Sequence, residues 1–360
     1  MKKHIESLDC YRGVAALGVA AIHFNINSSF FNSKFANGLF VQMFFVLSGF
    51  VLLINYINKI RNFSDIIQFI KKRILRLYPL HFFFLLLFLM IEITKYFFFI
   101  KYNLLPNEKI FEKNNFETFV YNLFLLQSFL EFHSYNTPSW SISVEFYTYV
   151  IFSIIIYLGI KKRIISLILL FIIIYLIKFK ETFGADLGIQ SLLSCIYSFT
   201  IGSIFGYYFI YKKIILNKNI LNFLFLLILF INIFLLFFIK KNNFAYLYPV
   251  AFGLLFYLTG HVKINTLIYK IIFNKFLIFL GKISYSIYMS HLIIFWILMQ
   301  FLRFIIKLPT YVNEFGVTKV SLTNLEANIV TVLCYVIVII FSYLTHKHVE
   351  LRFYNNNNFK

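Results

Sequence analysis

The stretch ILNFLFLLILFINIFLLFFI, residues Ile220–Ile239, carries no Asp, Glu, Lys or Arg in 20 positions. A helix of this length rises about 30 Å, which equals the thickness of the hydrocarbon core of a bilayer. Only Asn222 and Asn232 interrupt the run of apolar side chains. The stretch therefore predicts a transmembrane helix.

The rest of the chain has the same character. Its 360 residues are 61% hydrophobic and 13% charged, whereas a soluble domain carries about 25% charged residues. The sequence predicts an all-α fold, a polytopic transmembrane helical bundle. Residues 1–350 are expected to form a single membrane domain, followed by a short polar cytoplasmic tail at 351–360. Apolar length predicts about ten spanning helices, at Leu8–Asn27, Gly38–Tyr56, Tyr78–Ile100, Pro138–Ile160, Ile164–Ile177, Ile189–Tyr211, Ile220–Ile239, Phe244–Gly260, Phe276–Leu302 and Asn324–Thr345.

The net charge of +20 indicates an orientation rather than a nucleic-acid partner. Lys and Arg collect in the loops that stay in the cytoplasm. This bias is obtained when the N- and C-termini are both cytoplasmic. The stretch Phe116–Leu130 is apolar but short, so it is interpreted as an interfacial or re-entrant helix. If it crossed the bilayer, every later segment would change side.

Three cysteines, Cys10, Cys195 and Cys334, lie far apart in apolar stretches. Their spacing fits neither a disulfide framework nor a metal site. No metal cofactor is expected.

The first predicted span, LDCYRGVAALGVAAIHF, contains Arg12 and His23. Eleven residues of helix amount to about three turns plus 20° and to about 16 Å of rise, so both side chains lie on one face. Arg12 is expected near the cytoplasmic surface and His23 near the middle of the membrane. The functional interpretation is a buried base or nucleophile at His23 with Arg12 as a charge anchor. The structural interpretation is that Arg12 reaches the lipid headgroups or pairs with Asp9, and that His23 bonds a neighbouring helix.

Two arginines, Arg73 and Arg76, precede the third predicted span. At a spacing of i, i+3 they face one way on a helix, where two guanidinium groups can bind a phosphate or diphosphate. The alternative is ordinary anchoring to lipid headgroups on the cytoplasmic side.

The segment Asn136–Tyr149 begins the fourth predicted span and contains Glu145. Thr137 is expected to cap this helix and Pro138 to occupy its first position. Helical rise then places Glu145 about 10 Å into the outer half of the bilayer. A carboxylate at that depth is costly unless it is paired or takes part in chemistry. It is therefore either an acid–base group or a structural partner.

The ninth predicted span contains GKISYSIYMSHLIIF, residues Gly281–Phe295, in which His291 follows several Ser and Tyr residues. His291 is expected about 15 Å into the span. This helix either lines a polar cavity or uses its polar residues in bonds between helices.

These segments, in this order, resemble the acyltransferase-3 family of bacterial membrane O-acyltransferases. The similarity runs from about Ile5 to Glu350. Its motifs correspond to LDxxRGxAAxxVxxxH at Leu8–His23, FFxxSGF at Phe44–Phe50, RxxRxxP at Arg73–Pro79, WSLxxE at Trp140–Glu145 and SYxxYLxH at Ser284–His291. Two positions depart from the pattern: Ile142 and Met289 each replace a Leu.

The resemblance implies O-acylation, often acetylation, of extracytoplasmic glycans such as lipopolysaccharide O-antigen, capsule or peptidoglycan. Acyl-CoA, with acetyl-CoA as the expected form, would be the cytoplasmic donor, and the protein would lie in the bacterial inner membrane. Carried over by motif, Arg12 and His23 are the essential pair of the first helix, and Arg73 and Arg76 are essential arginines. The C-terminal hydrolase-like domain of some relatives is not expected here.

The mechanistic hypothesis combines both sources. Arg12, Arg73 and Arg76 would bind the phosphates of CoA, and the acyl-bearing arm would run beside the small residues of the first helix to His23. His23 would activate a sugar hydroxyl or carry the acyl group itself, and Glu145 would orient it or relay protons.

Acceptor binding is expected at Trp140, Ser141, Tyr285 and His291. A glycan or lipid-linked sugar exporter is the competing class, and a small-molecule acceptor is the alternative within the enzyme class. The sequence gives no oligomeric state.

Overall fold

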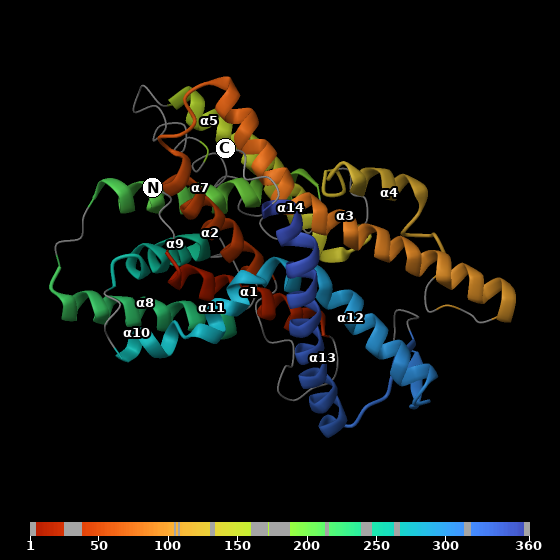
Figure 1. Ribbon diagram of the computed structural model, residues 1–360. Coiled ribbons are helices and arrows are strands. Elements are labelled where there is room, and N and C mark those ends of the chain that lie inside the picture. Colours follow the sequence, from red (N-terminus) through yellow and green to blue (C-terminus); the bar gives the residue numbers. More distant parts are fainter. Residues whose placement is uncertain are drawn as a thin grey trace. The chain divides into compact units, whose positions relative to one another are not determined.

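The structure is a computed structural model, and it describes residues 5–24, 38–103, 106, 109–129, 134–159, 172, 188–212, 216–238, 247–262, 267–312 and 318–355. In this part of the chain the protein is helical apart from one antiparallel pair of short strands, so the all-α fold is confirmed (Figure 1). The strands are β1 (Thr310–Val312) and β2 (Thr318–Val320), with Tyr311 opposite Lys319.

The helices are α1 (Ser7–His23), α2 (Leu39–Tyr56), α3 (Phe63–Tyr102), α4 (Phe116–Leu123), η1 (Thr137–Ser139), α5 (Trp140–Gly159), α7 (Ile189–Tyr211), α8 (Lys218–Phe238), α9 (Tyr248–Thr259), α10 (Leu267–Ile272), α11 (Lys275–Lys282), α12 (Ser284–Phe304), α13 (Asn324–Thr345), the π-helical turn η4 (His346–Glu350) and α14 (Leu351–Asn355). Of the described helices, seven are long and apolar enough to cross a bilayer. The protein is therefore a multi-pass membrane protein.

The predicted spans agree best where a long apolar run ends in polar residues. The bounds of α7 and α13 are those predicted. The helix α9 has 12 residues, fewer than the roughly 20 that a span needs. The predicted span Ile164–Ile177 lies outside the described residues.

The prediction of one helix over Phe276–Leu302 is wrong. Two helices, α11 and α12, occupy this stretch and meet at Ile283, whose φ of −94° and ψ of 7° end α11. The side chain of Asn274 caps α11 by accepting a hydrogen bond from the Leu277 amide at 2.9 Å. Caps and breaks of this kind do not change hydrophobicity, so the apolar run concealed them.

Contacts divide the chain into two compact units. Unit 1 comprises residues 1–19, 34–74 and 144–284, and unit 2 comprises residues 20–33, 75–143 and 285–360.

Unit 1 is built on the close packing of α2 against α7, which lie side by side (Figure 1). Glycines make the approach possible: a Cβ at Gly49 would overlap the carbonyl oxygen of Phe199, and a Cβ at Gly202 would overlap that of Val46. Gly202 and Gly206 form a GxxxG pair on α7, the pattern that lets backbones of membrane helices touch. The Ser203 hydroxyl then donates to the Gly49 carbonyl at 3.3 Å.

The small residues of α1 serve the same purpose within unit 1. A Cβ at Gly13 would lie 2.8 Å from Leu280 Cβ, and a Cβ at Gly18 would lie 2.5 Å from the Phe40 ring. Neighbouring side chains therefore occupy the space beside both glycines.

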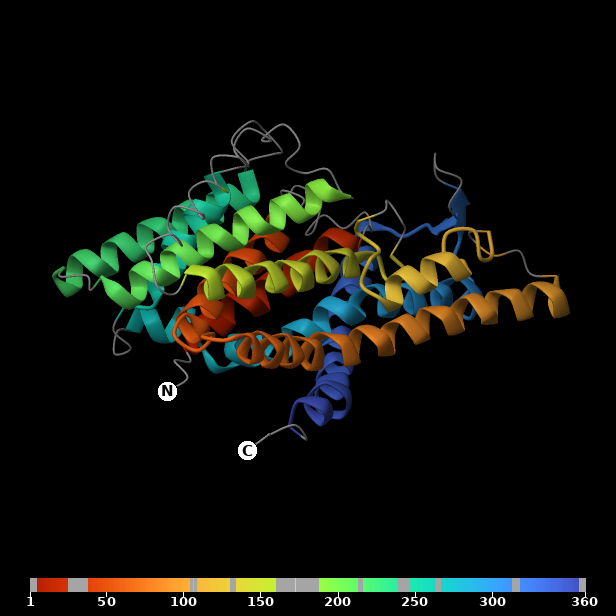
Figure 2. The ribbon, with the colours of Figure 1, turned by 90° about the horizontal axis from the view of Figure 1, so that it is seen from above.

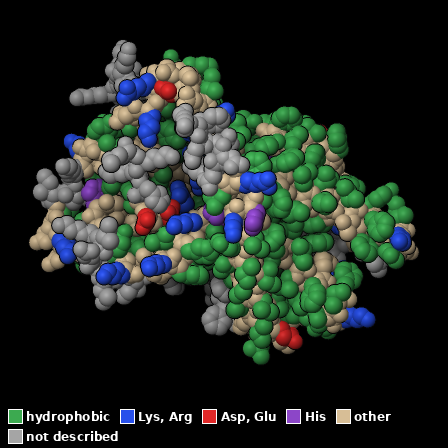
Figure 3. All heavy atoms as spheres, in the orientation of Figure 1, with side chains coloured by type: hydrophobic (Ala, Val, Ile, Leu, Met, Phe, Trp, Pro, Cys, Tyr) green, Lys and Arg blue, Asp and Glu red, His purple; other side chains and the backbone are tan. Residues whose placement is uncertain are grey.

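In unit 2, α13 has the inside-out pattern of a membrane helix. Large side chains of one stripe are exposed, among them Ile329 at 51%, Val336 at 48% and Ile340 at 57%. The opposite stripe is buried and small or polar, with Ala327 and Ser342 at 0%. Figure 3 shows hydrophobic side chains over α13. Close packing by small residues and an apolar lipid-facing stripe both suit a span.

The helix α3 is one continuous element of 40 residues, seen along its length in Figure 2. At 1.5 Å per residue it is about 60 Å long, twice the hydrocarbon thickness, so it extends beyond the span predicted at Tyr78–Ile100.

The helix α4 has 8 residues and cannot span, which agrees with the interfacial or re-entrant interpretation of Phe116–Leu130 as far as residue 129. Side chains of α3 hold its end. The Tyr78 hydroxyl donates to the Leu123 carbonyl at 3.0 Å, and His81 Nε2 lies 2.8 Å from the Asn122 carbonyl. Irregular backbone at membrane depth requires such partners.

Candidate active site

Two histidines face each other in unit 2. His23 is the last residue of α1, and its ring centroid lies 5.2 Å from that of His291 on α12, with the planes tilted by 35°. The next residue, Phe24, packs against Phe295 at 5.4 Å and Tyr335 at 5.0 Å and so fixes the end of α1. His23 is partly exposed, whereas His291 is fully buried.

The hydrogen bonds of His291 determine its tautomer. Its Nδ1 lies 3.2 Å from the Ile287 carbonyl oxygen, which can only accept a hydrogen bond, so Nδ1 carries the proton. In the neutral ring Nε2 is then an acceptor. This Nε2 is buried and has no hydrogen-bond partner among the described residues.

The start of α5 packs against α12 within unit 2. The Asn136 amide donates to the Met289 carbonyl at 2.8 Å, and the Tyr288 hydroxyl donates to the Pro138 carbonyl at 2.9 Å. Ser141 Oγ lies 2.7 Å from the Tyr288 hydroxyl. We call these paired segments, residues 136–141 and 287–291, the η1/α12 seam.

The expected cap at Thr137 is wrong. Thr137 is the first residue of the 3-10 helix η1, Asn136 precedes it in the capping position, and α5 begins only at Trp140. The helical turn η1 begins one residue earlier than predicted, so Thr137 is already helical, and Asn136 in the capping position makes no capping hydrogen bond with its side chain. Pro138, predicted at the first helical position, is the second residue of η1.

The backbone just before the seam is held by Tyr135. This phenol is buried and donates to the carbonyls of Asn114 and Asn115, both at 2.9 Å. Burial, and next the negative charge of Glu92, raise the pKa of Tyr135 to about 12. Tyr135 therefore remains a neutral donor at physiological pH.

Two of the residues predicted to bind acceptor have hydroxyl groups that already bond within unit 2. The Tyr285 hydroxyl donates to the Leu77 carbonyl at 2.6 Å, and Ser141 contacts Tyr288 as described. Trp140 accepts a hydrogen bond from Ser128 through its backbone carbonyl at 2.6 Å. These residues shape the seam, and their contact with a substrate stays a prediction.

Glu145 lies on α5 in unit 1, where two hydroxyl groups donate to its Oε1. One is Ser48 of α2 at 2.6 Å, and the other is Tyr149, one turn later on α5. The Tyr149 ring contacts the Phe69 ring of α3, with centroids 6.4 Å apart. FFVLSGF in α2, which contains Ser48, thus supplies a partner for the carboxylate.

Arg73 contacts the same aromatic ring, Phe69, as the Glu145 partner Tyr149. Its guanidinium carbon is 5.8 Å from the Tyr56 ring centroid and 5.7 Å from that of Phe69, the aromatic ring that also contacts Tyr149. Stacking of this kind holds an arginine in place while leaving its outer N–H groups available. Arg76 lies one turn later on α3, in unit 2.

Arg12 pairs with Asp9, as the structural interpretation held. Its Nη1 lies 3.0 Å from Asp9 Oδ1, and the Arg12 side chain keeps 23% of its surface exposed. Because α1 is continuous from Ser7 to His23, Arg12 and His23 lie on one helix.

Comparison with known proteins supplies the family. The model of the acyltransferase-3 family, described as an acyltransferase domain, matches residues 5–347, nearly the whole chain. The chain belongs to the acyltransferase-3 family. No curated protein and no solved structure matches it. Together with the seven candidate spans, this match makes the protein a membrane acyltransferase.

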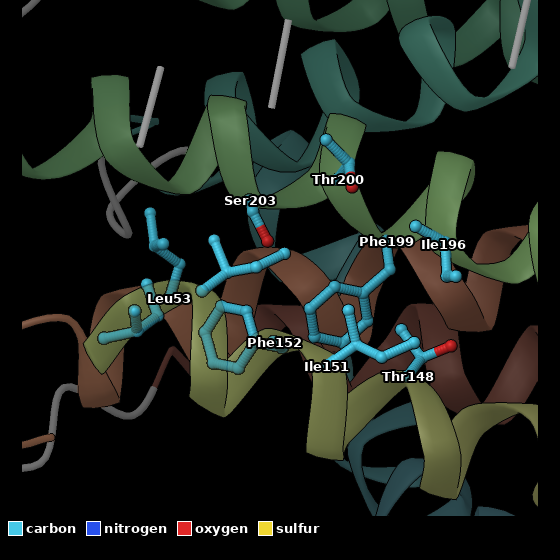
Figure 4. Close-up of a pocket in the computed structure, with 10 residues that line it drawn as sticks. Leu53, Thr148, Ile151, Phe152, Ile196, Phe199, Thr200 and Ser203 are labelled. Atoms are coloured by element: carbon cyan, nitrogen blue, oxygen red, sulfur yellow. The ribbon is translucent and has the colours of Figure 1, made fainter. Parts of the chain in front are cut away.

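A narrow pocket of this acyltransferase lies in unit 1 between α2, α5 and α7 (Figure 4). Its polar groups bond internally: Thr148 donates to the Val144 carbonyl at 2.8 Å and Ser203 to Gly49. The remaining walls are apolar, including Leu53 and Phe199. None of the predicted site residues lines this pocket, and its chemistry suits an apolar group.

Sequence reasoning missed several polar residues of the acyltransferase that the structure brings to the seam. They are Gln127, Ser128 and Asn136, all at most 2% exposed. Asn136 begins the segment Asn136–Tyr149, whereas nothing in the sequence singles out Gln127 and Ser128 within the stretch Phe116–Leu130. Among the residues that the structure describes, no three His, Cys, Asp or Glu side chains are placed to hold a metal ion.

Proposed function

We propose that this acyltransferase moves an acyl group, expected to be acetyl, from cytoplasmic acyl-CoA to a hydroxyl group of an extracytoplasmic or lipid-linked glycan. Its expected location is the bacterial plasma membrane. The observation that carries the proposal is His23, placed at the end of α1 against His291, on the helix that carries Arg12 three turns earlier.

The chemistry assigned to His23 is proton transfer. A neutral imidazole takes the proton of the acceptor hydroxyl as its oxygen attacks the thioester carbonyl. The new C–O bond forms, the C–S bond breaks, and the proton passes to the departing CoA thiolate. The second route is attack by His23 itself, which gives an acyl-imidazole that the hydroxyl then cleaves. Both routes need an unprotonated ring nitrogen on His23.

The donor site is proposed at the arginines. Arg73, held by Tyr56 and Phe69, keeps N–H groups that suit the phosphates of CoA, and Arg76 and Arg12 would add charge. Because Leu280 and Phe40 fill the space beside Gly13 and Gly18, the acyl-bearing arm would have to pass α1 on another side of the helix.

Glu145 is proposed as the second acid–base group. Two hydroxyl donors fix its Oε1, and such fixed geometry is what a group that accepts or relays protons requires. Its role in orienting His23 stays a prediction.

Mass spectrometry of the host's surface glycans tests the proposal. Four strains are compared: wild type, His23→Ala, one without the gene, and His261→Ala as the matched control. His261 bonds the Tyr257 carbonyl at 2.9 Å in unit 1 and is assigned no role. We expect an acyl-sized mass increment with wild type and His261→Ala alone.

The other outcomes are equally specific. An increment that persists in His23→Ala contradicts the assignment of His23. Glycans of unchanged mass, together with an acylated small molecule that depends on His23, replace the glycan acceptor by a small one.

A further inference from the structure

Besides His81 Nδ1 on α3 and the Ser134 hydroxyl, three buried hydrogen-bond acceptors of unit 2 have no partner among the described residues. They are Gln127 Oε1, Asn136 Oδ1 and His291 Nε2. The side chains are fully or almost fully buried, with Gln127 and His291 at 0% and Asn136 at 2% exposure.

The orientation of each group is fixed by a backbone carbonyl. The Gln127 amide nitrogen donates to the Ser139 carbonyl at 3.0 Å, and the Asn136 amide nitrogen donates to the Met289 carbonyl at 2.8 Å. Because a carbonyl can only accept, neither amide can be turned round without bringing two oxygens together. His291 is fixed in the same way by Ile287. All three free atoms are therefore acceptors.

The three side chains are linked through the seam. Gln127 contacts Ser139, in the middle of residues 136–141, and Asn136 contacts Met289, two residues before His291. Tyr288 joins the two segments by donating to Pro138 and packs its ring 6.2 Å from that of His291. The seam also leads to His23, the ring neighbour of His291.

A buried acceptor without a donor costs free energy, and native proteins avoid it unless water or a ligand completes the bond. Two such acceptors in the seam, and a third on a side chain that bonds to it, indicate that donors come from outside the chain. An anion is unsuitable, since acceptors repel it. A cation is unsuitable because no carboxylate of the described part of the chain bonds to the seam. A neutral group with several hydroxyls is the chemistry that fits.

We propose that Gln127, Asn136 and His291 form a subsite that accepts hydrogen bonds from the hydroxyl groups of a neutral polyhydroxylated acceptor beside His23. That the bound molecule is the substrate that receives the acyl group rests on the proposed function, whereas the binding of its hydroxyl groups does not. Gln127 and Asn136 bind hydroxyl groups that do not react, and His291 positions the hydroxyl group next to His23.

The test is a binding titration that needs no catalysis. The chain has two tryptophans, and Trp140 lies in the seam. Trp296→Phe removes the other, which is partly exposed on α12 at 36%, so the fluorescence reports Trp140. The protein is held in lipid nanodiscs, since maltoside detergents would compete. The probes are methyl α-D-glucopyranoside and tetrahydropyran-2-methanol, which share a ring but differ in the number of hydroxyls.

We expect saturable binding of the glucoside at least about tenfold tighter than that of the single-hydroxyl probe, because each lost hydroxyl leaves a buried acceptor unpaired. Gln127→Met and Asn136→Leu should each weaken glucoside binding about three- to tenfold. The matched control is Asn232→Leu in unit 1. The Asn232 amide also donates to backbone carbonyls, at 2.7 Å to Ile228, and its Oδ1 is likewise buried without a partner. Its replacement should leave binding unchanged.

Equal affinity for the two probes, or no saturable response, overturns the inference and leaves water as the partner of these acceptors. This comparison uses the seam intact, so it stands even if a variant fails to fold. Consumption of acetyl-CoA is measured separately: glucoside binding without thioester consumption contradicts the proposed function but not this subsite. Thioester consumption with no preference between the probes contradicts the subsite but not the proposed function.

Discussion

The imidazole rings of His23 and His291 lie 5.2 Å apart, centroid to centroid, although 268 residues separate them in the chain. His291 is held from behind by the Ile287 carbonyl, and its Nε2 is left without a partner in the described structure. Two charged imidazolium groups at this separation would repel each other strongly inside a membrane protein. The two rings are therefore expected to act as a unit.

The first prediction concerns this unit. His23→Ala should lower turnover of acetyl-CoA with a hydroxyl acceptor by about 10²- to 10⁴-fold, the usual contribution of a general base. His291→Ala should lower it by about tenfold or more, and the double variant should be no slower than His23→Ala, since residues that act together are not additive. The measurement is thiol release in nanodiscs. Independent, multiplicative losses would show that His291 does not act through His23.

The second prediction concerns Glu145. Glu145→Gln keeps an oxygen that can accept from Ser48 and Tyr149, so thermal stability should change by less than about 1 kcal/mol. Turnover should fall by about tenfold or more if its carboxylate takes part in proton transfer. The control is Glu112→Gln, which removes an exposed acid paired with Lys109 at 3.4 Å. It should change neither thermal stability nor turnover. Full activity in Glu145→Gln would make Glu145 a structural acceptor only.

The hydroxyl groups around Glu145 make a separate prediction. Ser48→Ala and Tyr149→Phe each remove one donor to Oε1. Each should destabilise the protein by about 1–3 kcal/mol, since the carboxylate is left partly unsatisfied. In Glu145→Gln background the same changes should cost less, because hydrogen bonds to a charged group are the stronger ones. Thermal unfolding measures these costs. Equal costs in both backgrounds would show that the Ser48 and Tyr149 hydroxyls bind the glutamine as strongly as they bind Glu145.

The fourth prediction concerns the donor. Arg73→Gln should raise the KM for acetyl-CoA by about tenfold while leaving kcat within about twofold, because it removes a contact made equally in ground and transition states. Arg73→Lys should recover little, since lysine neither stacks on Tyr56 and Phe69 nor binds phosphate in bidentate fashion. Arg61→Gln, at an exposed arginine whose Nε donates to the Asn58 carbonyl, is the control. An unchanged KM in Arg73→Gln would remove this arginine from the donor site.

The spans were predictable because apolar length is a property of the sequence itself. The helices α7 and α13 are bounded by polar residues, and both of their predicted ends agree with the structure to the residue. The break at Ile283 was not predictable, since Lys275–Phe304 remains largely apolar through it. It lies next to Gly281, whose backbone lies against Asp9, a contact between distant parts of the chain.

The candidate site was predictable residue by residue but not as an arrangement. Arg12, His23, Glu145 and His291 stand out because polar groups are costly in apolar segments. Which of them meet depends on tertiary packing: His23 meets His291, and Glu145 meets Ser48 and Tyr149. Gln127 and Asn136 were missed because they stand out only by having side-chain oxygen atoms without a hydrogen-bond donor. This feature depends on the folded structure, in which backbone carbonyls fix the orientation of both amides.

The last prediction concerns the packing that supports Glu145. The site depends on α2 and α5 being held in unit 1, and α2 is fixed by its backbone contact with α7. Gly49→Ala and Gly202→Ala should each destabilise the protein by about 3 kcal/mol or more, because the added methyl group meets a backbone carbonyl that cannot move aside. Gly206→Ala should cost less, since its Cβ would lie 2.8 Å from the Phe50 carbonyl oxygen.

Thermal unfolding in nanodiscs ranks the three variants, and thiol release follows activity below the unfolding temperature. If Gly49→Ala were as stable as Gly206→Ala, α2 and α7 would not pack backbone to backbone. Because Ser48 is the neighbour of Gly49, any displacement of α2 that Gly49→Ala causes should also lengthen the bond from Ser48 to Glu145. Activity should therefore fall in Gly49→Ala more than in Gly206→Ala even when both proteins are folded.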